Sequence, residues 1–299
     1  MADLLSSPAP PNRLRDLLDR DLIDTGAPLL LPGCYDALGA RLIEQAGFDG
    51  VYMTGFGSAA SLLGRPDVGL LGLAEMVDNA RRITDAVGVP VVADADTGYG
   101  NPINVVHTVR SFERAGVAAI HLEDQVTPKR CGHMDDKEVV PVAEFAAKIR
   151  AAVDARASDD FLIIARTDAR ASLGLDEARR RADAAVEAGA DVLFIEALQT
   201  RDEVAQVAEE YQDIPLLYNW VEGGKSPRLT HAELTDYGFA VVIMPITMLL
   251  AATGGMQAAL AAIRSDGSPV NVEATTPSFN EFNETIGLVE INELQRRYQ

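Results

Sequence analysis

The chain has 299 residues, 47% of them hydrophobic, which suits an ordinary soluble α/β enzyme. Its formal net charge of -19 and pI near 4.5 argue against nucleic acid or membrane as a partner, because both would repel an acidic surface. The two cysteines, Cys34 and Cys131, fit neither a zinc site nor a disulfide framework. With no signal peptide and no run of about 18 apolar residues, we expect a cytoplasmic protein.

Apolar segments recur along the chain, and a helical pattern follows each of them. The predicted strands cover residues 28–33, 50–55, 90–96, 118–124, 161–167, 191–197, 215–220 and 240–247. Four predicted helices end at a glycine, which closes a helix at little conformational cost. These are Gly47, Gly116, Gly189 and Gly238. Eight strand-helix units in about 250 residues favour a (β/α)8 TIM barrel over an open doubly wound sheet.

Two segments depart from the repeating unit. Residues 125–140 form a long polar connection after the fourth strand, and such loops are usually functional, so we predict a mobile lid. The last segment has an apolar face at helical spacing, formed by Phe279, Phe282, Ile286 and Val289. A helix of this kind beyond a closed barrel needs a partner, and a subunit interface is our hypothesis. The predicted division is a leader and helix at 1–27, a catalytic barrel at 28–265 and a helical tail at 266–299.

Carboxylates stand at the ends of two predicted strands. Asp94 and Asp96 end the third strand, and Glu123 and Asp124 end the fourth. Because side chains alternate along a strand, Asp94 and Asp96 should face one side, and Glu123 should share a face with His121 while Asp124 faces away. Buried carboxylates need a partner, and a hard cation is a natural one. The alternative is that these acids cap helices or pair with arginines.

The active site of a (β/α)8 barrel lies at the C-terminal ends of the strands. Seven polar residues are expected there: Thr54, Asp94, Asp96, Glu123, Arg166, Glu196 and Asn219. Arg166 suits bidentate binding of a substrate carboxylate. A structural ion pair between Arg166 and Glu196 is the alternative. His121 is expected to fill the barrel interior as a hydrogen-bonded residue without a catalytic role.

A five-residue motif resembles a known signature. Residues 129–133, Lys-Arg-Cys-Gly-His, match the K-[KR]-C-G-H signature of the isocitrate lyase and phosphoenolpyruvate mutase superfamily. The motif occurs with ADADTGYGN, HLEDQ, ARTDA and NWVEGG in the expected order, and the similarity runs from about Pro28 to the C-terminus. The resemblance implies a (β/α)8 barrel, a magnesium ion that manganese can replace, and 2-oxo or 2-hydroxy acid substrates. It also implies a homotetramer whose subunits exchange a C-terminal helix.

The branch of the superfamily is indicated by the residues after the predicted seventh strand. Asn219 is followed by Trp-Val-Glu-Gly-Gly, whereas methylisocitrate lyases usually carry Thr-Glu-Phe-Gly there. This stretch, with FNEFNETIGLVEINEL near the end, resembles the branch that contains 2,3-dimethylmalate lyase, petal-death lyase and carboxyphosphonoenolpyruvate phosphonomutase. Relatives have small or flexible residues beside this asparagine, whereas this chain has Tyr218 and Trp220. The identity of the substrate is therefore not determined by the resemblance.

The resemblance also implies a metal site. Asp94, Asp96 and Glu123 would hold magnesium, largely through water molecules. Asp67, in GRPDVG, would support this metal shell, with a turn aspartate as the alternative. The ion would stabilise charge that develops on the substrate oxygen during the reaction.

The resemblance places the catalytic groups in the predicted lid. Cys131 would protonate the carbanion left by bond cleavage, and Lys129, Arg130 and His133 would compensate negative charge. An inert loop thiol is the alternative for Cys131, while Cys34 is expected to be structural. The resemblance also implies a set of substrate-binding residues, in which backbone amides after the second strand bind a carboxylate. The set consists of Thr54, Gly55, Phe56, Gly132, Arg166, Glu196 and Asn219.

These roles predict a magnesium-dependent carbon-carbon lyase. Its substrate would be a substituted 2-hydroxy dicarboxylate of the 2,3-dimethylmalate or 2-methylisocitrate type, cleaved to pyruvate or glyoxylate and a short carboxylate. Two alternatives use the same scaffold. One is a phosphonomutase acting on a carboxyphosphonoenolpyruvate-like substrate, and the other is an oxaloacetate hydrolase or decarboxylase.

Overall fold

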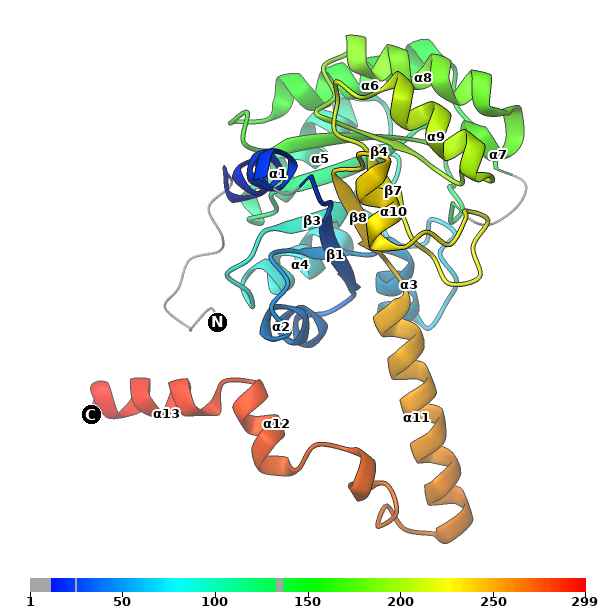
Figure 1. The fold of residues 1–299 in the computed structure, drawn as a ribbon. Coiled ribbons are helices and arrows are strands. Elements are labelled where there is room, and N and C mark those ends of the chain that lie inside the picture. Colours follow the sequence, from blue (N-terminus) through cyan, green and yellow to red (C-terminus); the bar gives the residue numbers. More distant parts are fainter. Residues whose placement is uncertain (1–11, 25, 133–136) are drawn as a thin grey trace.

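The computed structural model describes residues 12–24, 26–132 and 137–299. Strands in these ranges form one parallel sheet with the order β6-β5-β4-β3-β2-β1-β8-β7. Their bounds are β1 Leu29–Cys34, β2 Val51–Met53, β3 Val91–Asp94, β4 Ala119–Glu123, β5 Leu162–Thr167, β6 Val192–Ile195, β7 Leu217–Asn219 and β8 Val241–Met244. A parallel bridge from Leu193 to Leu216, which precedes β7, joins the two ends of this order. The predicted (β/α)8 barrel is confirmed (Figure 1).

Helices surround the barrel in the expected alternation with the strands, except for the first, which precedes β1 and packs at one end of the barrel. They are α1 Asn12–Asp24, α2 Ala37–Gln45, α3 Gly55–Leu63, α4 Leu73–Thr84, α5 Pro102–Arg114, α6 Val142–Ala155, α7 Ala169–Leu173, α8 Leu175–Glu187, α9 Arg201–Glu210 and α10 His231–Asp236. The four glycines predicted to end helices, Gly47, Gly116, Gly189 and Gly238, all have a positive φ, between 78° and 93°. Their role as helix terminators is therefore confirmed.

The alternation of side chains along each strand divides the apolar core in two. Outward residues such as Ile163 pack against the surrounding helices, where Phe112 of α5 is completely buried. Inward residues such as Ala119 pack inside the barrel together with Leu14 and Leu17 of α1. The first helix thus contributes to the barrel interior and not to the outer helical layer.

Polar contacts show which end of the barrel α1 covers. Arg13 Nη1 donates to the Gly88 carbonyl over 2.5 Å, and Arg15 Nη2 donates to Asp191 Oδ1 over 3.0 Å. Gly88 lies three residues before β3 and Asp191 directly precedes β6, so α1 lies at the N-terminal ends of the strands. The C-terminal ends remain available for a functional site.

The prediction that residues 90–96 form one strand is wrong at its end. β3 stops at Asp94, and Asp96 has a φ of 49°, outside the extended range. The Asp96 amide donates to Asp94 Oδ1 over 2.9 Å, which folds the chain into a turn. The alternation of side chains along a strand therefore does not determine the direction of the Asp96 side chain. By contrast, Asp124 faces away from Glu123 as expected, because its carboxylate binds Thr167 Oγ1 and the amide of Asp168.

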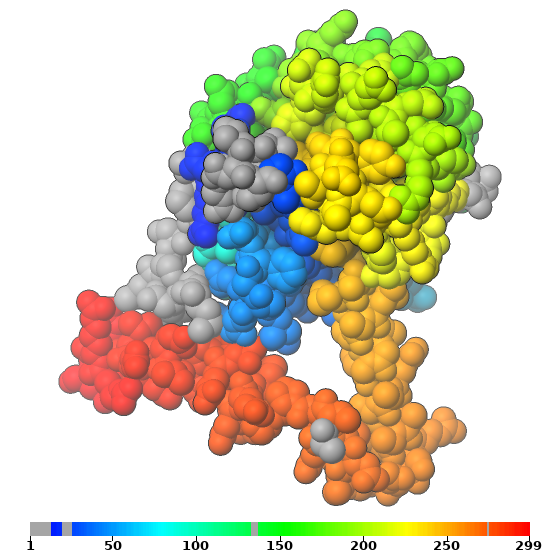
Figure 2. All heavy atoms as spheres, in the orientation of Figure 1, coloured from blue at the N-terminus to red at the C-terminus, as the bar shows by residue number. Residues whose placement is uncertain are grey.

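The C-terminal part of the chain leaves the barrel (Figure 1). It comprises α11 Thr247–Asp266, the short 3-10 helix η1 Glu273–Thr275, α12 Phe279–Thr285 and α13 Leu288–Arg297, with no buried residue in α11, α12 or α13. The single helix predicted for the tail is wrong, because Gly287, with a φ of 85°, separates α12 from α13. Figure 2 shows α11 standing out from the body of the molecule, with the red end of the chain to its left, beneath the barrel.

Two contacts bring the tail back toward the barrel. Gln45 Nε2 at the end of α2 donates to the Thr285 carbonyl over 2.9 Å, and Arg41 lies beside Gly287. The four apolar residues predicted to form an interface, Phe279, Phe282, Ile286 and Val289, are all exposed. In the described part of the chain, no helix combines the length and apolar character needed to cross a membrane.

Candidate active site at the C-terminal mouth of the barrel

A cavity of about 230 Å³ opens at the C-terminal ends of the strands. Nine residues predicted for the site line it: Thr54, Phe56, Asp67, Asp94, Cys131, Gly132, Arg166, Glu196 and Asn219. They come from segments spread over more than half of the chain, and closure of the barrel brings them together. The cavity is therefore the candidate active site.

The strand-end acids lie below this cavity in a buried cluster with one lysine. Asp94, Asp96 and Glu123 are all buried. Lys129 Nζ lies 2.6 Å from Asp96 Oδ1 and 2.6 Å from Asp67 Oδ2, so the structure places Asp67 in the same cluster. The ammonium group joins the first residue of the signature motif to the acids after β3.

Burial and neighbouring charges have opposite effects on the pKa of each group in this cluster. Burial raises the pKa of Asp96 to about 7, although Lys129 opposes the shift. Burial also raises the pKa of Glu123 well above its ordinary value. Burial alone would lower the pKa of Lys129, but Asp96, Asp94 and Glu123 hold it well above its usual range. Burial thus disfavours the ionised form of these two acids, and a further cation beside them would favour it.

The donor set fits a hydrated divalent cation. Neither carboxylate oxygen of Glu123 accepts a hydrogen bond from any residue in the described ranges, although Arg166 Nη1 lies 3.2 Å from its Oε2. Buried carboxylate oxygens without donors are the kind of ligand that magnesium prefers. Within those same ranges, no three His, Cys, Asp or Glu side chains converge closely enough to ligate one ion directly. The arrangement is thus compatible with binding through water molecules, which magnesium commonly retains.

His121 and Tyr52 form the floor beside Asp94. Tyr52 Oη and His121 Nε2 are 2.7 Å apart in a hydrogen bond, and His121 Nε2 lies 3.6 Å from Asp94 Oδ1. Burial lowers the pKa of His121 to about 4, so the imidazole is neutral near pH 7. His121 is a buried hydrogen-bonded residue, as expected. Tyr52 lines the cavity and was missed, although its spacing from Thr54 puts both on one strand face.

The N-terminus of α3 forms a second wall. The Thr54 side chain caps the helix by accepting from the Gly57 amide, while the Thr54 amide donates to the Cys34 carbonyl over 3.0 Å. Of the three amides predicted to bind a carboxylate, those of Gly55 and Phe56 remain in the first turn, where amides have no acceptor in their own helix. A Cβ at Gly55 would lie 2.4 Å from Asp94 Oδ2, so glycine permits this close approach.

The described part of the predicted lid packs tightly onto the barrel mouth. A Cβ added to Gly132 would lie 2.4 Å from Arg166 Nη2 and 2.7 Å from Glu196 Oε2, which leaves room for glycine alone. Cys131 is half-buried and lines the cavity, and its amide donates to the Asp67 carbonyl over 3.3 Å. The loop therefore contributes Cys131 to the lining of the cavity.

The other motif residues lie in different surroundings. The Gln125 side chain binds both the amide and the carbonyl of Arg130, over 2.9 and 2.8 Å. Arg130 is exposed and does not line the cavity, so its predicted role in charge compensation remains a prediction. His133, predicted to take part in catalysis, lies outside the described residues.

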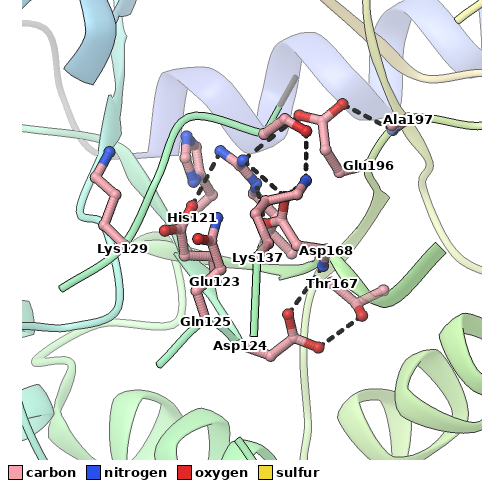
Figure 3. A network of polar contacts seen from close by, with 12 residues as sticks. His121, Glu123, Asp124, Gln125, Lys129, Lys137, Thr167, Asp168, Glu196 and Ala197 are labelled. Carbon is pink, nitrogen blue, oxygen red and sulfur yellow. Dashed lines mark hydrogen bonds and ion pairs between the residues drawn. The ribbon is translucent and has the colours of Figure 1, made fainter. Parts of the chain in front are cut away.

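Arg166 is the centre of a buried ion network, whose acids Glu123, Asp168 and Glu196 are labelled in Figure 3. Its guanidinium contacts Asp168 Oδ2 at 3.0 Å and Glu196 Oε2 at 3.6 Å, in addition to Glu123. Glu196 Oε2 also accepts from Asn219 Nδ2 over 2.9 Å. The ion pair between Arg166 and Glu196 therefore exists, yet both residues also line the cavity. Asp168 was missed, although it belongs to the ARTDA stretch.

The far wall of the cavity was also missed. It follows β7 and β8 and consists of Val221, Glu222, Gly223, Gly224, Pro245 and Ile246. Tyr218 Oη donates to the Pro227 carbonyl over 2.6 Å, and Trp220 Nε1 donates to the Leu229 carbonyl over 3.1 Å. These two bonds fold the segment after β7 into a braced loop. Tyr218 and Trp220 thus shape the cavity through this loop and not by lining it.

Comparison with known proteins identifies relatives over almost the whole chain. The family model described as phosphoenolpyruvate phosphomutase matches residues 18–264. The chain is 48% identical to 2,3-dimethylmalate lyase of Eubacterium barkeri, over 93% of this chain and 96% of that protein. It is 41% identical to the chloroplastic carboxyvinyl-carboxyphosphonate phosphorylmutase of Arabidopsis thaliana, over 93% of this chain and 83% of that protein.

Solved structures agree with these relatives. A crystal structure of 2,3-dimethylmalate lyase, a member of the PEP mutase/isocitrate lyase superfamily, has a TM-score of 0.91 and 39% identity, covering 98% of this chain and 96% of that one. Oxaloacetate acetylhydrolase with 3,3-difluorooxalacetate has a TM-score of 0.90 and 38% identity, covering 98% of each chain. Phosphonopyruvate hydrolase with oxalate and Mg²⁺ has a TM-score of 0.84 and 34% identity, covering 95% and 99%. The protein therefore belongs to the phosphoenolpyruvate phosphomutase family, within the superfamily that its sequence motifs resemble.

Proposed function

We propose that this protein is a magnesium-dependent carbon-carbon lyase that cleaves a methylated malate of the 2,3-dimethylmalate type to pyruvate and propionate. The observation that carries the proposal is the cavity geometry. A half-buried cysteine on the loop faces Arg166, Glu196 and Asn219, beside a cluster of buried acids. The 48% identity to 2,3-dimethylmalate lyase over nearly the full length of both proteins supports this reaction over others of the family.

In this proposal, Asp94, Asp96 and Glu123 hold the metal through water, and Asp67 supports them through Lys129. The relative with bound Mg²⁺ and oxalate supports the choice of ion, for which manganese is the expected substitute. When bound, the ion supplies positive charge beside the reacting oxygen of the substrate.

The residues of the chain then bind the substrate and supply a proton. Arg166 and the first-turn amides of α3 hold a substrate carboxylate. The C2 hydroxyl loses its proton to a base, the C2–C3 bond breaks, and C2 becomes the carbonyl carbon of pyruvate. The electron pair of that bond stays on C3, where the Cys131 thiol donates its proton to complete propionate. Cys131 lines the same cavity as Arg166, and its thiol would serve as the proton donor there.

The far wall of the cavity supports a methylated substrate. Val221, Pro245 and Ile246 present apolar surface that suits methyl groups. Among the described residues that line the cavity, Arg166 is the one cation, and it lies on β5, two strands from β7 and three from β8 around the barrel. A third carboxylate placed there would lie near Glu222 without a positive partner. The wall thus favours a methylated malate over the tricarboxylate 2-methylisocitrate.

We also propose that the assembly is a homotetramer in which the C-terminal tail of one subunit docks on another. The tail exposes large apolar side chains, among them Val270, Phe279 and Val289. Apolar surface of this extent usually marks a protein interface. We infer a cytoplasmic location from the two cysteines, which form no disulfide in an acidic protein of this family.

A substrate panel tests the proposed reaction. The protein is incubated with Mg²⁺ and 2,3-dimethylmalate, 2-methylisocitrate, isocitrate, citramalate or oxaloacetate, with release of 2-oxo acid as the signal and a chelator control. We expect chelator-sensitive release of pyruvate from 2,3-dimethylmalate above all other compounds. Oxaloacetate is followed separately as oxalate against pyruvate, because it also decarboxylates with metal alone.

Two results would contradict the proposal. Oxalate production from oxaloacetate alone would assign the hydrolase reaction named for one structural neighbour. Inactivity across the panel, in a folded protein that binds Mg²⁺, would favour the phosphorus chemistry named for the plant relative.

A further inference from the structure

A buried lysine outside the signature motif connects the cysteine loop to the substrate-binding arginine. The side chain of Lys137 is 1% exposed, and its Nζ lies 2.6 Å from Asp168 Oδ1. The same Nζ donates to the carbonyl oxygen of Gly132, the residue after Cys131. Figure 3 shows Lys137 between the loop and Asp168, with Glu196 close by. One ammonium group thus holds the loop backbone to a carboxylate of the barrel.

Asp168 is itself held rigidly on the barrel. Its amide donates to Asp124 Oδ1 over 2.8 Å, and its carboxylate accepts from Arg166 Nε and Nη2 over 3.0 and 3.2 Å. Although burial opposes the shift, Arg166 and Lys137 hold the pKa of the Asp168 carboxyl well below its usual range. Asp168 therefore stays ionised and binds both cations at once.

We propose that Lys137 is a positioning residue that fixes the Cys131 loop against Arg166 through its contacts with Gly132 and Asp168. Because Gly132 already fits against Arg166 and Glu196 without space for a Cβ, a shift of its carbonyl displaces the loop as a whole. The adjacent thiol then moves relative to the carboxylate-binding guanidinium. The effect of Lys137 on turnover rests on the proposed lyase function, whereas its effect on loop position does not.

The loop position has a direct catalytic consequence. Proton transfer needs donor and acceptor at hydrogen-bond distance, and a misplacement of about 1 Å costs about 100-fold in rate. Loss of the Lys137 contacts should therefore lower kcat much more than it raises KM. A residue that only stabilised the fold would instead lower the amount of folded enzyme and leave kcat per folded molecule unchanged.

The test compares three variants of the full-length protein. Lys137→Met removes the charge while keeping the length of the side chain, and Lys137→Arg keeps the charge. Arg170→Met is the matched control, since it breaks the ion pair of Arg170 with Glu203 two residues after Asp168 without touching the loop. Iodoacetamide labelling of Cys131, followed by peptide mass spectrometry without substrate, measures loop position. Cys34 is completely buried and serves as the internal reference.

We expect Lys137→Met to be labelled at Cys131 at least about 5-fold faster than wild type, with kcat lowered about 10- to 100-fold and KM changed by less than about 3-fold. Lys137→Arg should recover much of both properties, which keeps the test valid if Lys137→Met folds poorly. Wild-type labelling of Cys131 in folded Lys137→Met, or equal acceleration in Arg170→Met, would overturn the proposal. If wild type cleaves no compound of the panel, the lyase proposal fails while the labelling rates still decide the role of Lys137.

Discussion

The barrel mouth and the C-terminal tail both depart from the usual distribution of side chains, in opposite ways: the mouth buries charged groups and the tail exposes apolar ones. At the mouth, charged groups such as Arg166, Lys129 and Lys137 are buried. In the tail, apolar groups are exposed, with Val270 66% and Phe279 80% accessible. At the mouth, the cost of burying these charges is offset within one chain, because each of these cations contacts at least one carboxylate. The tail leaves its apolar groups exposed on the single chain.

This difference shows that contacts within one chain account for the buried charges of the mouth but not for the exposed apolar groups of the tail. Buried ion pairs contribute little net stability, since burial of each charge is costly, and such networks are retained for other reasons. At the mouth that reason is the proposed chemistry. Exposed apolar surface is unfavourable in a monomer, and the proposed homotetramer would cover the tail with a second copy of the chain. The predictions below test the two halves of this comparison.

The largest effect is expected at the mouth. Cys131→Ser should lower kcat by about 1,000-fold, because a serine hydroxyl is a much weaker acid than a thiol while the geometry is retained. Mg²⁺ binding and the free energy of unfolding should stay close to wild type, since Cys131 is only half-buried. Steady-state kinetics with 2,3-dimethylmalate and urea unfolding measure both. Near-normal turnover would remove the cysteine from the mechanism.

Asp168→Asn should reduce the free energy of unfolding by about 3 kcal/mol, because Lys137 and Arg166 stay buried with one carboxylate fewer. The folded-state pKa of Asp168 lies below its unfolded value, so its stabilisation is present above about pH 4 and is lost as the pH falls further. The difference from wild type should therefore shrink in acid.

The control for this prediction is Asp159→Asn. The Asp159 side chain is 93% exposed and pairs with Arg156, so it should change the free energy of unfolding by less than about 1 kcal/mol. Urea titrations at pH 7 compare both variants with wild type. An equal decrease in the free energy of unfolding in the two variants would mean that the buried network contributes no more to stability than an exposed ion pair.

Deletion of the chain after Ser268 should reduce the molar mass of the assembly and leave the barrel folded. The removed segment contributes apolar surface that contacts its own barrel at few points, such as Thr285 on Gln45. Light scattering measures the mass, and circular dichroism checks the fold. Phe279→Ser combined with Phe282→Ser is the subtler version and should weaken the assembly in the same direction. An unchanged mass would refute the proposed interface.

The smallest effect is expected on the far wall of the cavity. Val221→Thr replaces a methyl group with a hydroxyl of similar shape, which makes the wall more polar. The ratio of kcat/KM for 2,3-dimethylmalate over 2-methylisocitrate should fall by up to about 10-fold. Urea unfolding should differ little, because Val221 is only partly buried. An unchanged ratio would show that this wall does not select the substrate.

The agreement between sequence and structure differs from element to element. The strands and the glycine-terminated helices follow from local pattern, and the strand-end acids follow from position in a barrel. The turn at Asp96 and the break at Gly287 do not, because a single residue with a positive φ interrupts an otherwise regular pattern. The hydrogen bonds by which Tyr218 and Trp220 brace the loop could likewise not be predicted from the sequence, since their partners are backbone carbonyl groups, which every residue carries.

By itself the sequence determined the barrel, the acid cluster, the cysteine motif and the family, because periodicity and short motifs are local properties of the chain. The tertiary structure alone decided which charges meet. Lys129 reaches Asp67 and Lys137 reaches Asp168 only once the loop after β4 folds over the closed barrel. Such contacts depend on distances between segments far apart in the chain. No local pattern encodes them, and they set the geometry on which the proposed chemistry depends.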